Sequence, residues 1–184
     1  MVAVEYKREK YLHGGLKADP ANIDTLIADL NNHDGLVRQR ARITLVDIGE
    51  PAVESLIKAL ETKKDPVHWE AAKALSQIGN PKSVQALVNA LQDNQFSVRW
   101  LAAEGLIAIG RYSLVPLLQA LVDRAESARL REGAHHVIHD LVSRNLLDPF
   151  SKTQIIPVLT ALNDSEPAVE VPLAAERALQ AINQ

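Results

Sequence analysis

The segment VRWLAAEGLIAIG, residues 98–110, contains the most informative pattern of the chain. The same pattern occurs twice earlier in the chain, as VRQRARITLVDIG at residues 37–49 and as VHWEAAKALSQIG at residues 67–79. Each copy closes with Ile-Gly and has a leucine three residues before that isoleucine. The closing glycines are 30 and then 31 residues apart (79 − 49 and 110 − 79). A fixed period of this length indicates a chain of stacked structural repeats.

Each repeat has the apolar spacing of two helices. In the third repeat, residues 87–91 form the first short apolar segment, and Val98, Ala102, Leu106 and Ile109 lie on one face of the second. This spacing is typical of amphipathic helices. We expect the closing glycine to end the second helix in a left-handed conformation, because a residue without a Cβ adopts positive φ at little cost.

Two further copies of the pattern are more divergent. Leu130, Ala134, Ile138 and Leu141 fit the second helix of a fourth repeat, and residues 171–182 fit that of a fifth. We therefore predict an all-α, right-handed solenoid, an armadillo-like helical fold, in one domain over residues 20–184. Its five repeats are predicted at residues 22–50, 51–80, 81–111, 113–144 and 154–183. A longer loop is expected at residues 143–153, and the polar residues 1–19 are expected to form an N-terminal arm.

The turn Asp34-Gly35-Leu36-Val37-Arg38, the closing Leu-x-x-Ile-Gly and the segment SVRWLAAE at residues 97–104 resemble HEAT repeats. More specifically, they resemble the HEAT-like repeats of the phycobilin lyases, and the resemblance covers residues 22–183. It implies the fold strongly and an activity only weakly, because relatives of this kind include both lyase subunits and adaptors. The family also contains iron-binding hydroxylases that use His-Glu pairs, but this chain has no His-Glu dipeptide.

Composition argues against several classes of function. The chain has 184 residues, of which 47% are hydrophobic and 23% charged, as is typical of a folded soluble protein. Its formal net charge of −3 argues against nucleic acid as a partner. It has no cysteine, so disulfides and thiol chemistry are excluded. We expect no apolar run that approaches the length of a membrane span, and we predict a cytoplasmic protein with no membrane partner.

The second helices of such a stack are expected to line a concave surface where a partner would bind. With 100° of rotation per residue, Trp100 and Glu104 point away from the buried side of their helix, and so do Ala103 and Ile107. The only other tryptophan, Trp69, has the same register one repeat earlier. The two indole rings are therefore predicted to lie on the same surface.

These tryptophans, with Ala72 and Ala103 beside them, predict a shallow hollow with an apolar wall. Exposed tryptophan is enriched at binding hot spots, whereas the alternative is that each ring folds over the next helix. The predicted partner-binding residues are Arg42, Trp69, Lys73, Trp100, Glu104, His135 and His139. Arg42 would bind a ligand anion or an acidic segment of the partner. Arg38 and Arg99 are instead expected to pair structurally with acidic residues of neighbouring turns.

Three histidines of the fourth repeat raise the question of a metal site. His135 and His139 are four residues apart and can share a helix face, with His136 between them and Glu132 nearby. Such a set could bind a divalent metal, but a fourth ligand is missing from the local motif. Because surface histidines at an interface are the alternative, we assign no metal ligand and no cofactor. The chain has no phosphate-binding glycine loop, nucleophile elbow or cysteine nucleophile, so we assign no catalytic residue.

The sequence therefore favours a non-catalytic binding module, a scaffold or adaptor, over an enzyme. Its partner would be a protein segment, a peptide or a second copy of the chain, held on the concave face of the solenoid. By resemblance alone, the alternative is a bilin lyase subunit or a chromophore-handling factor, with Arg42 near a propionate of the tetrapyrrole. A third hypothesis is a metal-dependent enzyme at the histidine cluster.

Overall fold

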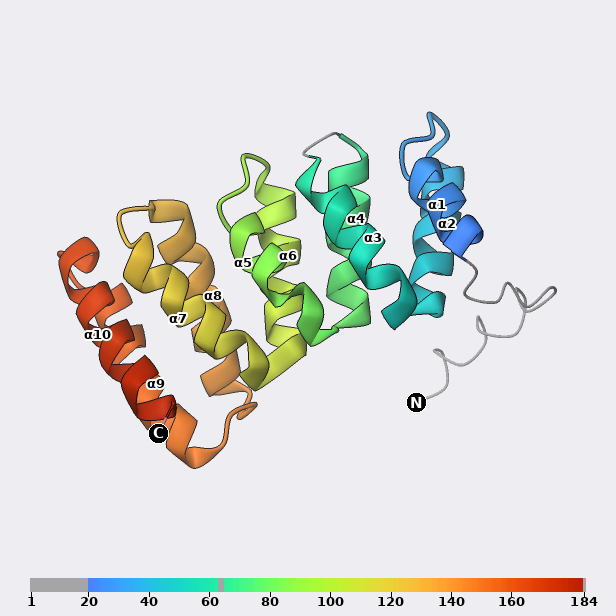
Figure 1. The fold of residues 1–184 in the computed structure, drawn as a ribbon. Helices are drawn as coiled ribbons and strands as arrows, with labels where there is room; N and C mark the ends of the chain where they lie inside the picture. Colours follow the sequence, from blue (N-terminus) through green and yellow to red (C-terminus); the bar gives the residue numbers. More distant parts are fainter. Residues whose placement is uncertain (1–19, 63–64, 184) are drawn as a thin grey trace, which may run out of the picture.

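The computed structural model describes residues 20–62 and 65–183, which form ten α-helices arranged in a row of antiparallel pairs (Figure 1). The helices are α1 Pro20–Asp29, α2 Gly35–Ile48, α3 Val53–Glu61, α4 Val67–Ile78, α5 Val84–Ala90, α6 Phe96–Ile109, α7 Leu114–Asp123, α8 Ala128–Ser143, α9 Pro149–Leu162 and α10 Pro167–Ile182. The described part of the chain contains no strand, and the predicted all-α solenoid is confirmed. The predicted N-terminal arm, residues 1–19, lies outside the described residues.

The recurring Ile-Gly marks the point where the chain passes from one repeat to the next. Gly49, Gly79 and Gly110 have φ values of 74°, 62° and 71°, as expected for glycine stops. Of the three, only Gly79, with a ψ of 31°, is in the left-handed helical region. Gly49 and Gly110 have ψ values of −131° and −136°, which lie outside it. Short 3-10 turns follow at η2 Glu50–Ala52, η3 Pro81–Ser83 and η4 Gly110–Ser113.

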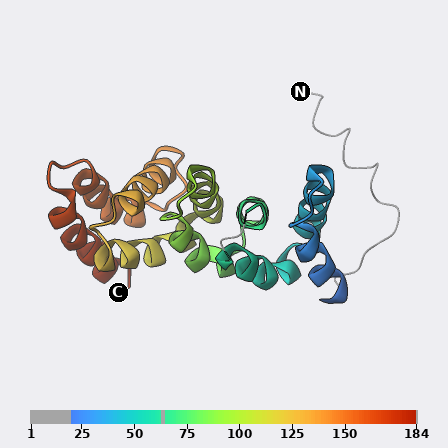
Figure 2. The same ribbon diagram turned by 90° about the horizontal axis from the view of Figure 1, so that it is seen from above.

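The helices form two layers, which Figure 2 shows from above. α2, α4, α6 and α8 pack successively against one another and form what we call the even-helix layer. α1, α3, α5 and α7 form the other layer in the same way. A helix in the middle of the stack is therefore enclosed on three sides, and α6 packs against α4, α5 and α8.

The last pair of helices is placed the other way round. α9 packs against α8, whereas α10 packs against α7 and α9, so the final helix lies beside the layer of first helices. The prediction that residues 171–182 form a second helix like the others is therefore wrong. The physical reason is the connection 144–148, which sends the chain back alongside α8. The predicted loop at residues 143–153 is shorter than expected, because Asp148 caps α9 and accepts a hydrogen bond from the Ser151 amide at 3.0 Å.

The core combines leucines from both layers with small residues where the helices pack closely. One alanine near the middle of each even-numbered helix up to α8 is at most 2% exposed: Ala41, Ala71, Ala102 and Ala134. These are positions that the sequence periodicity places on the buried face. Gly105 brings α6 close to α4, since a Cβ there would lie 3.2 Å from Ser76 Cα and 2.9 Å from Leu87 Cδ1. The even-helix layer is therefore packed tightly enough to position its surface side chains.

One helical segment, Phe96–Asp123, is long and apolar enough by length and composition to cross a membrane, with a mean hydropathy of 1.5. The prediction that no such run exists is wrong in that sense. The segment comprises α6, η4 and α7, and the chain turns at Gly110, where φ is positive. Of its most apolar stretch, 56% is buried inside the protein. Packing in the core of the stack accounts for its apolar character.

Candidate partner-binding surface

An exposed group of aromatic rings lies across α6 and α8 on the even-helix layer. The indole of Trp100 stacks on the His136 ring, with ring centroids 4.7 Å apart and 23° between the planes. Phe96, one helical turn before Trp100, tilts against it at a centroid distance of 6.4 Å. Phe96 is 68% exposed and Trp100 is 47% exposed. We call Phe96, Trp100, His136 and the adjoining Glu104 the aromatic cluster.

Polar contacts hold the rings of the aromatic cluster in place. His136 Nε2 lies 3.4 Å from Glu104 Oε1, so the imidazole is held between an indole face and a carboxylate. The Arg99 guanidinium lies over the Phe96 ring, 5.5 Å from its centroid. Side chains that are already ordered lose less conformational entropy when a partner binds. The cluster is therefore a preorganised apolar surface with one cation and one carboxylate beside it.

Two of the four residues of the aromatic cluster were predicted from the sequence. Trp100 and Glu104 are among the predicted partner-binding residues, whereas Phe96 and His136 are not. The missing signals were in the sequence, because Phe96 precedes Trp100 by one helical turn and His136 follows Glu104 at the repeat spacing. The prediction rested on the tryptophans and on the i, i+4 pair of His135 and His139, and neither Phe96 nor His136 belongs to these features.

The predicted hollow between the two tryptophans is not formed. Ala72 and Ala103 are 0% and 2% exposed, and Ile107 is 4% exposed. Trp100 makes its described ring contacts within the aromatic cluster and not with Trp69. The prediction assumed that α6 is buried on one face only. Because α4, α5 and α8 all pack against it, a much narrower stripe of this helix reaches the surface.

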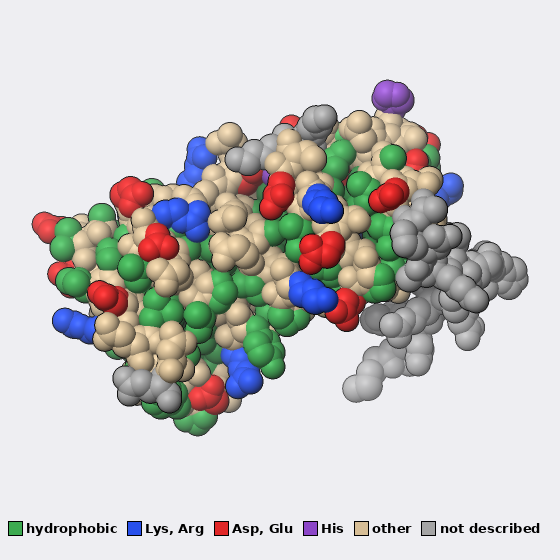
Figure 3. Space-filling model, in the orientation of Figure 1, with side chains coloured by type: hydrophobic (Ala, Val, Ile, Leu, Met, Phe, Trp, Pro, Cys, Tyr) green, Lys and Arg blue, Asp and Glu red, His purple; other side chains and the backbone are tan. Residues whose placement is uncertain are grey.

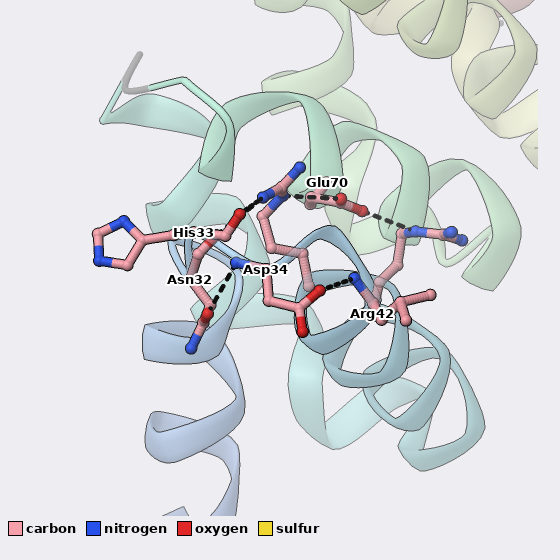
Figure 4. A network of polar contacts seen from close by, with 7 residues as sticks. Asn32, His33, Asp34, Arg42 and Glu70 are labelled. Carbon is pink, nitrogen blue, oxygen red and sulfur yellow. Dashed lines mark hydrogen bonds and ion pairs between the residues drawn. The ribbon is translucent and has the colours of Figure 1, made fainter.

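Arg42 joins two repeats, as Figure 4 shows. Its Nε donates to Glu70 Oε2 at 2.8 Å, and its Nη1 donates to Gln77 Oε1 at 3.0 Å. The Glu70 side chain, only 8% exposed, also lies 3.6 Å from Arg38 Nε. Two arginines of α2 therefore share one nearly buried carboxylate of α4. The predicted role of Arg42 as an anion-binding residue would require this contact to break.

The repeated turn arginines have the structural role that was predicted, although an ion pair with an acidic residue of the next repeat is formed only by Arg38, with Glu70, among the described contacts of Arg38 and Arg99. Arg38 Nη1 donates to two carbonyls of its own turn, at 2.8 and 3.1 Å. Arg99 Nη1 does the same at 2.9 and 3.2 Å, and Arg131 Nη1 donates to the carbonyl of Ala125. Each of these arginines closes the turn of its own repeat, where carbonyl groups would otherwise lack donors.

The remaining predicted residues lie on α4 and α8. Trp69 and Lys73 are half-buried, and Trp69 packs against the core. His135 and His139 stack on each other with centroids 6.1 Å apart and planes at 15°, as their spacing predicts. His139 Nδ1 also lies 3.3 Å from Asp140 Oδ1. Within the described residues, no three His, Asp or Glu side chains gather closely enough to hold a metal ion.

The face drawn in Figure 3 differs in character from the aromatic cluster. Acidic, basic and apolar side chains are intermixed over it, and neither sign of charge forms a continuous block. A mixed surface of this kind is ordinary for a folded protein. The exposed rings of the even-helix layer are therefore the more specific feature.

Comparison with known proteins relates part of the chain to a repeat family. The family described as HEAT repeats matches residues 23–106, so the repeats in this part of the chain are similar to HEAT repeats. The chain is also similar to the crystal structure of an engineered protein from the Northeast Structural Genomics Consortium, with 21% identity and a TM-score of 0.44, over 88% of this chain and 48% of that one. This chain thus spans about half the length of the engineered protein. No curated protein matches the sequence.

Proposed function

We propose that this protein is a non-catalytic binding module that holds a protein or peptide partner against the aromatic cluster. HEAT repeats commonly mediate protein interactions, and stacked repeats present extended surfaces for this purpose. One observation carries the proposal: Phe96 and Trp100 remain largely exposed although neighbouring side chains hold their rings in order. Burial of such rings by a partner would gain about 25 cal/mol for each Å² of apolar surface removed from water.

The groups beside the rings suggest how a partner would be oriented. Arg99 and Glu104 place a cation and a carboxylate at the edge of the apolar surface. Charged groups at the rim of an interface contribute more to orientation and association rate than to affinity. The partner segment is therefore expected to bring an apolar side chain onto the rings and polar groups to either side.

A photocrosslinking amino acid at position 96 tests the proposal directly. Irradiation in a lysate of the native source, followed by mass spectrometry, identifies proteins that touch this position. The affinity of the purified partner is then measured for the wild type and for Trp100→Ala. Loss of a hot-spot tryptophan is expected to cost about 2 kcal/mol, or about thirtyfold in affinity.

Leu36→Ala is the matched control, because Leu36 is an apolar side chain that is 60% exposed on α2, outside the aromatic cluster. It should leave the affinity unchanged. If Trp100→Ala, shown to be folded by circular dichroism, binds the partner as tightly as the wild type does, the aromatic cluster is not the binding surface.

Three finer predictions accompany the proposal. If the partner is a second copy of the chain, the sedimentation coefficient of the wild type should depend on protein concentration, and Trp100→Ala should remove that dependence. The bilin alternative rests on resemblance alone, and an absorbance shift of added bilin on binding would support it. We also propose a cytoplasmic location, which fractionation of native cells would test.

A further inference from the structure

A cavity of about 300 Å³ lies where three successive hairpins meet, and it shares no residue with the aromatic cluster. Its walls include Leu60 and Glu61 at the end of α3, Asn89 and Ala90 at the end of α5, and Arg124 just after α7. Its volume is at the lower limit of pockets that hold small molecules. The cavity therefore suits a ligand no larger than a single amino acid or sugar.

One wall of the cavity is built by a departure from the repeat pattern. His68 occupies the position that is arginine in the neighbouring repeats (Arg38, Arg99 and Arg131). Those arginines bind the carbonyls of their own turns, whereas His68 Nε2 lies 2.9 Å from Asp93 Oδ2 of the next hairpin. Asp93 Oδ1 also accepts a backbone amide of its own turn at 2.8 Å. Both carboxylate oxygens are thus engaged, so this pair shapes the cavity and does not supply a free charge.

Two other groups at the cavity, Arg124 and Glu61, carry opposite charges. The half-buried Arg124 makes its described guanidinium contact with the amide oxygen of Asn89, at a long 3.3 Å. Neither Arg124 nor Glu61 forms an ion pair with another described residue. Between these charges, Leu60, Ala86 and Ala90 contribute buried apolar surface. The lining therefore combines one cation and one anion, each without an ion pair to any residue that the structure describes, with a small apolar area.

We propose that this cavity binds a small zwitterion, an α-amino acid with a short aliphatic side chain. Its carboxylate would pair with Arg124, its ammonium group with Glu61, and its side chain would cover Leu60, Ala86 and Ala90. Charge-assisted hydrogen bonds are stronger than neutral ones, and a ligand with only one charge would leave one wall group unpaired. Valine is the simplest probe with all three features.

The test is a titration of the ¹⁵N-labelled full chain with valine, followed by amide chemical shifts in NMR spectra. We expect saturable shifts at Glu61, Ala86 and Ala90 at concentrations up to about 10 mM. Isovalerate lacks the ammonium group and valine amide lacks the carboxylate, so each should bind about tenfold more weakly. Arg124→Gln should lose valine binding to a similar extent, whereas Arg129→Gln, on an arginine outside the cavity, should not.

Three results would overturn the proposal: no saturable shift with valine, equal binding of both single-charge analogues, or wild-type binding by Arg124→Gln. If Arg124→Gln does not fold, all of its amide signals change and the variant cannot report on binding. Glu61→Gln therefore serves as a second variant and should also weaken valine binding about tenfold. Trp100→Ala should bind valine as the wild type does, because the cavity and the aromatic cluster have no residue in common. The two proposals can therefore fail separately.

Discussion

Trp100 on α6 rests on the imidazole of His136 on α8, with ring centroids 4.7 Å apart, and the same imidazole reaches Glu104 at 3.4 Å. This contact joins side chains of two successive repeats at the surface of the even-helix layer. It covers one face of an exposed indole with a second aromatic ring, and the carboxylate of Glu104 holds that ring from its other side.

The stack predicts that the fluorescence of Trp100 depends on the His136 ring. In His136→Ala the indole loses the ring that covers it, so its emission should shift to longer wavelengths as more water reaches it. The measurement uses Trp69→Phe as the background, in which Trp100 is the only indole of the chain. His135→Ala is the control, because the His135 ring stacks on His139. Equal emission spectra of His136→Ala and its parent would show that the stack does not shield the indole.

The nearly buried carboxylate of Glu70 should matter for stability. Glu70→Gln weakens the contacts with Arg42 and Arg38 and leaves two guanidinium groups without their counter-ion. We expect a loss of about 2 kcal/mol in the free energy of unfolding, measured with urea. Glu50→Gln is the control, because Glu50 pairs with Lys82 in an exposed position, and it should have no measurable effect. Equal effects of the two substitutions would contradict the structural role of Glu70.

Gly105 should tolerate no larger residue, because α6 and α4 touch at this point. The added Cβ of Gly105→Ala would lie 3.2 Å from the backbone of Ser76, which cannot move without separating the helices. A net destabilisation of about 1–2 kcal/mol is expected, since overpacking outweighs the helix propensity gained. Gly35→Ala, where the nearest atom is 3.5 Å away on the flexible Arg38 side chain, should be neutral or slightly stabilising. A stabilised Gly105→Ala would refute the close approach.

Asp148 at the start of α9 should contribute stability that is lost in acid. The Ser151 hydroxyl and amide donate hydrogen bonds to this carboxylate and lower its pKa below the ordinary value. A depressed pKa in the folded state means that the contribution is present above the unfolded pKa and disappears as the pH falls through the folded pKa. Ser151→Ala should raise the pKa of Asp148, measured by ¹³C NMR of its carboxyl group. Asp164, whose pKa is lowered by contacts with Glu166 and Ser165, is the internal reference and should not change.

Helix periodicity predicts only some of the exposed residues at the candidate site. Trp100 and Glu104 follow from a helical projection of α6, and both reach the surface in the structure. The same projection also exposes Ala103 and Ile107, which are buried. A projection assumes a single buried face, whereas each inner helix of this stack has three neighbours. The contact between Trp100 and His136 depends on how α8 is placed beside α6. Gly133 contributes to the placement of α8 by letting it approach Leu91 at the end of α5, since a Cβ at Gly133 would lie 2.8 Å from the Leu91 side chain.

The all-α repeat architecture follows from the sequence alone, because it depends on local features: apolar faces specify helices, and the glycines that recur every 30 or 31 residues accept the positive φ that ends them. Three features become visible only in the folded chain: α9 and α10 exchange places, Arg42 pairs with Glu70, and His68 reaches Asp93. These features depend on which helices become neighbours. That choice follows from packing and connection length across repeats, which no single stretch of sequence contains.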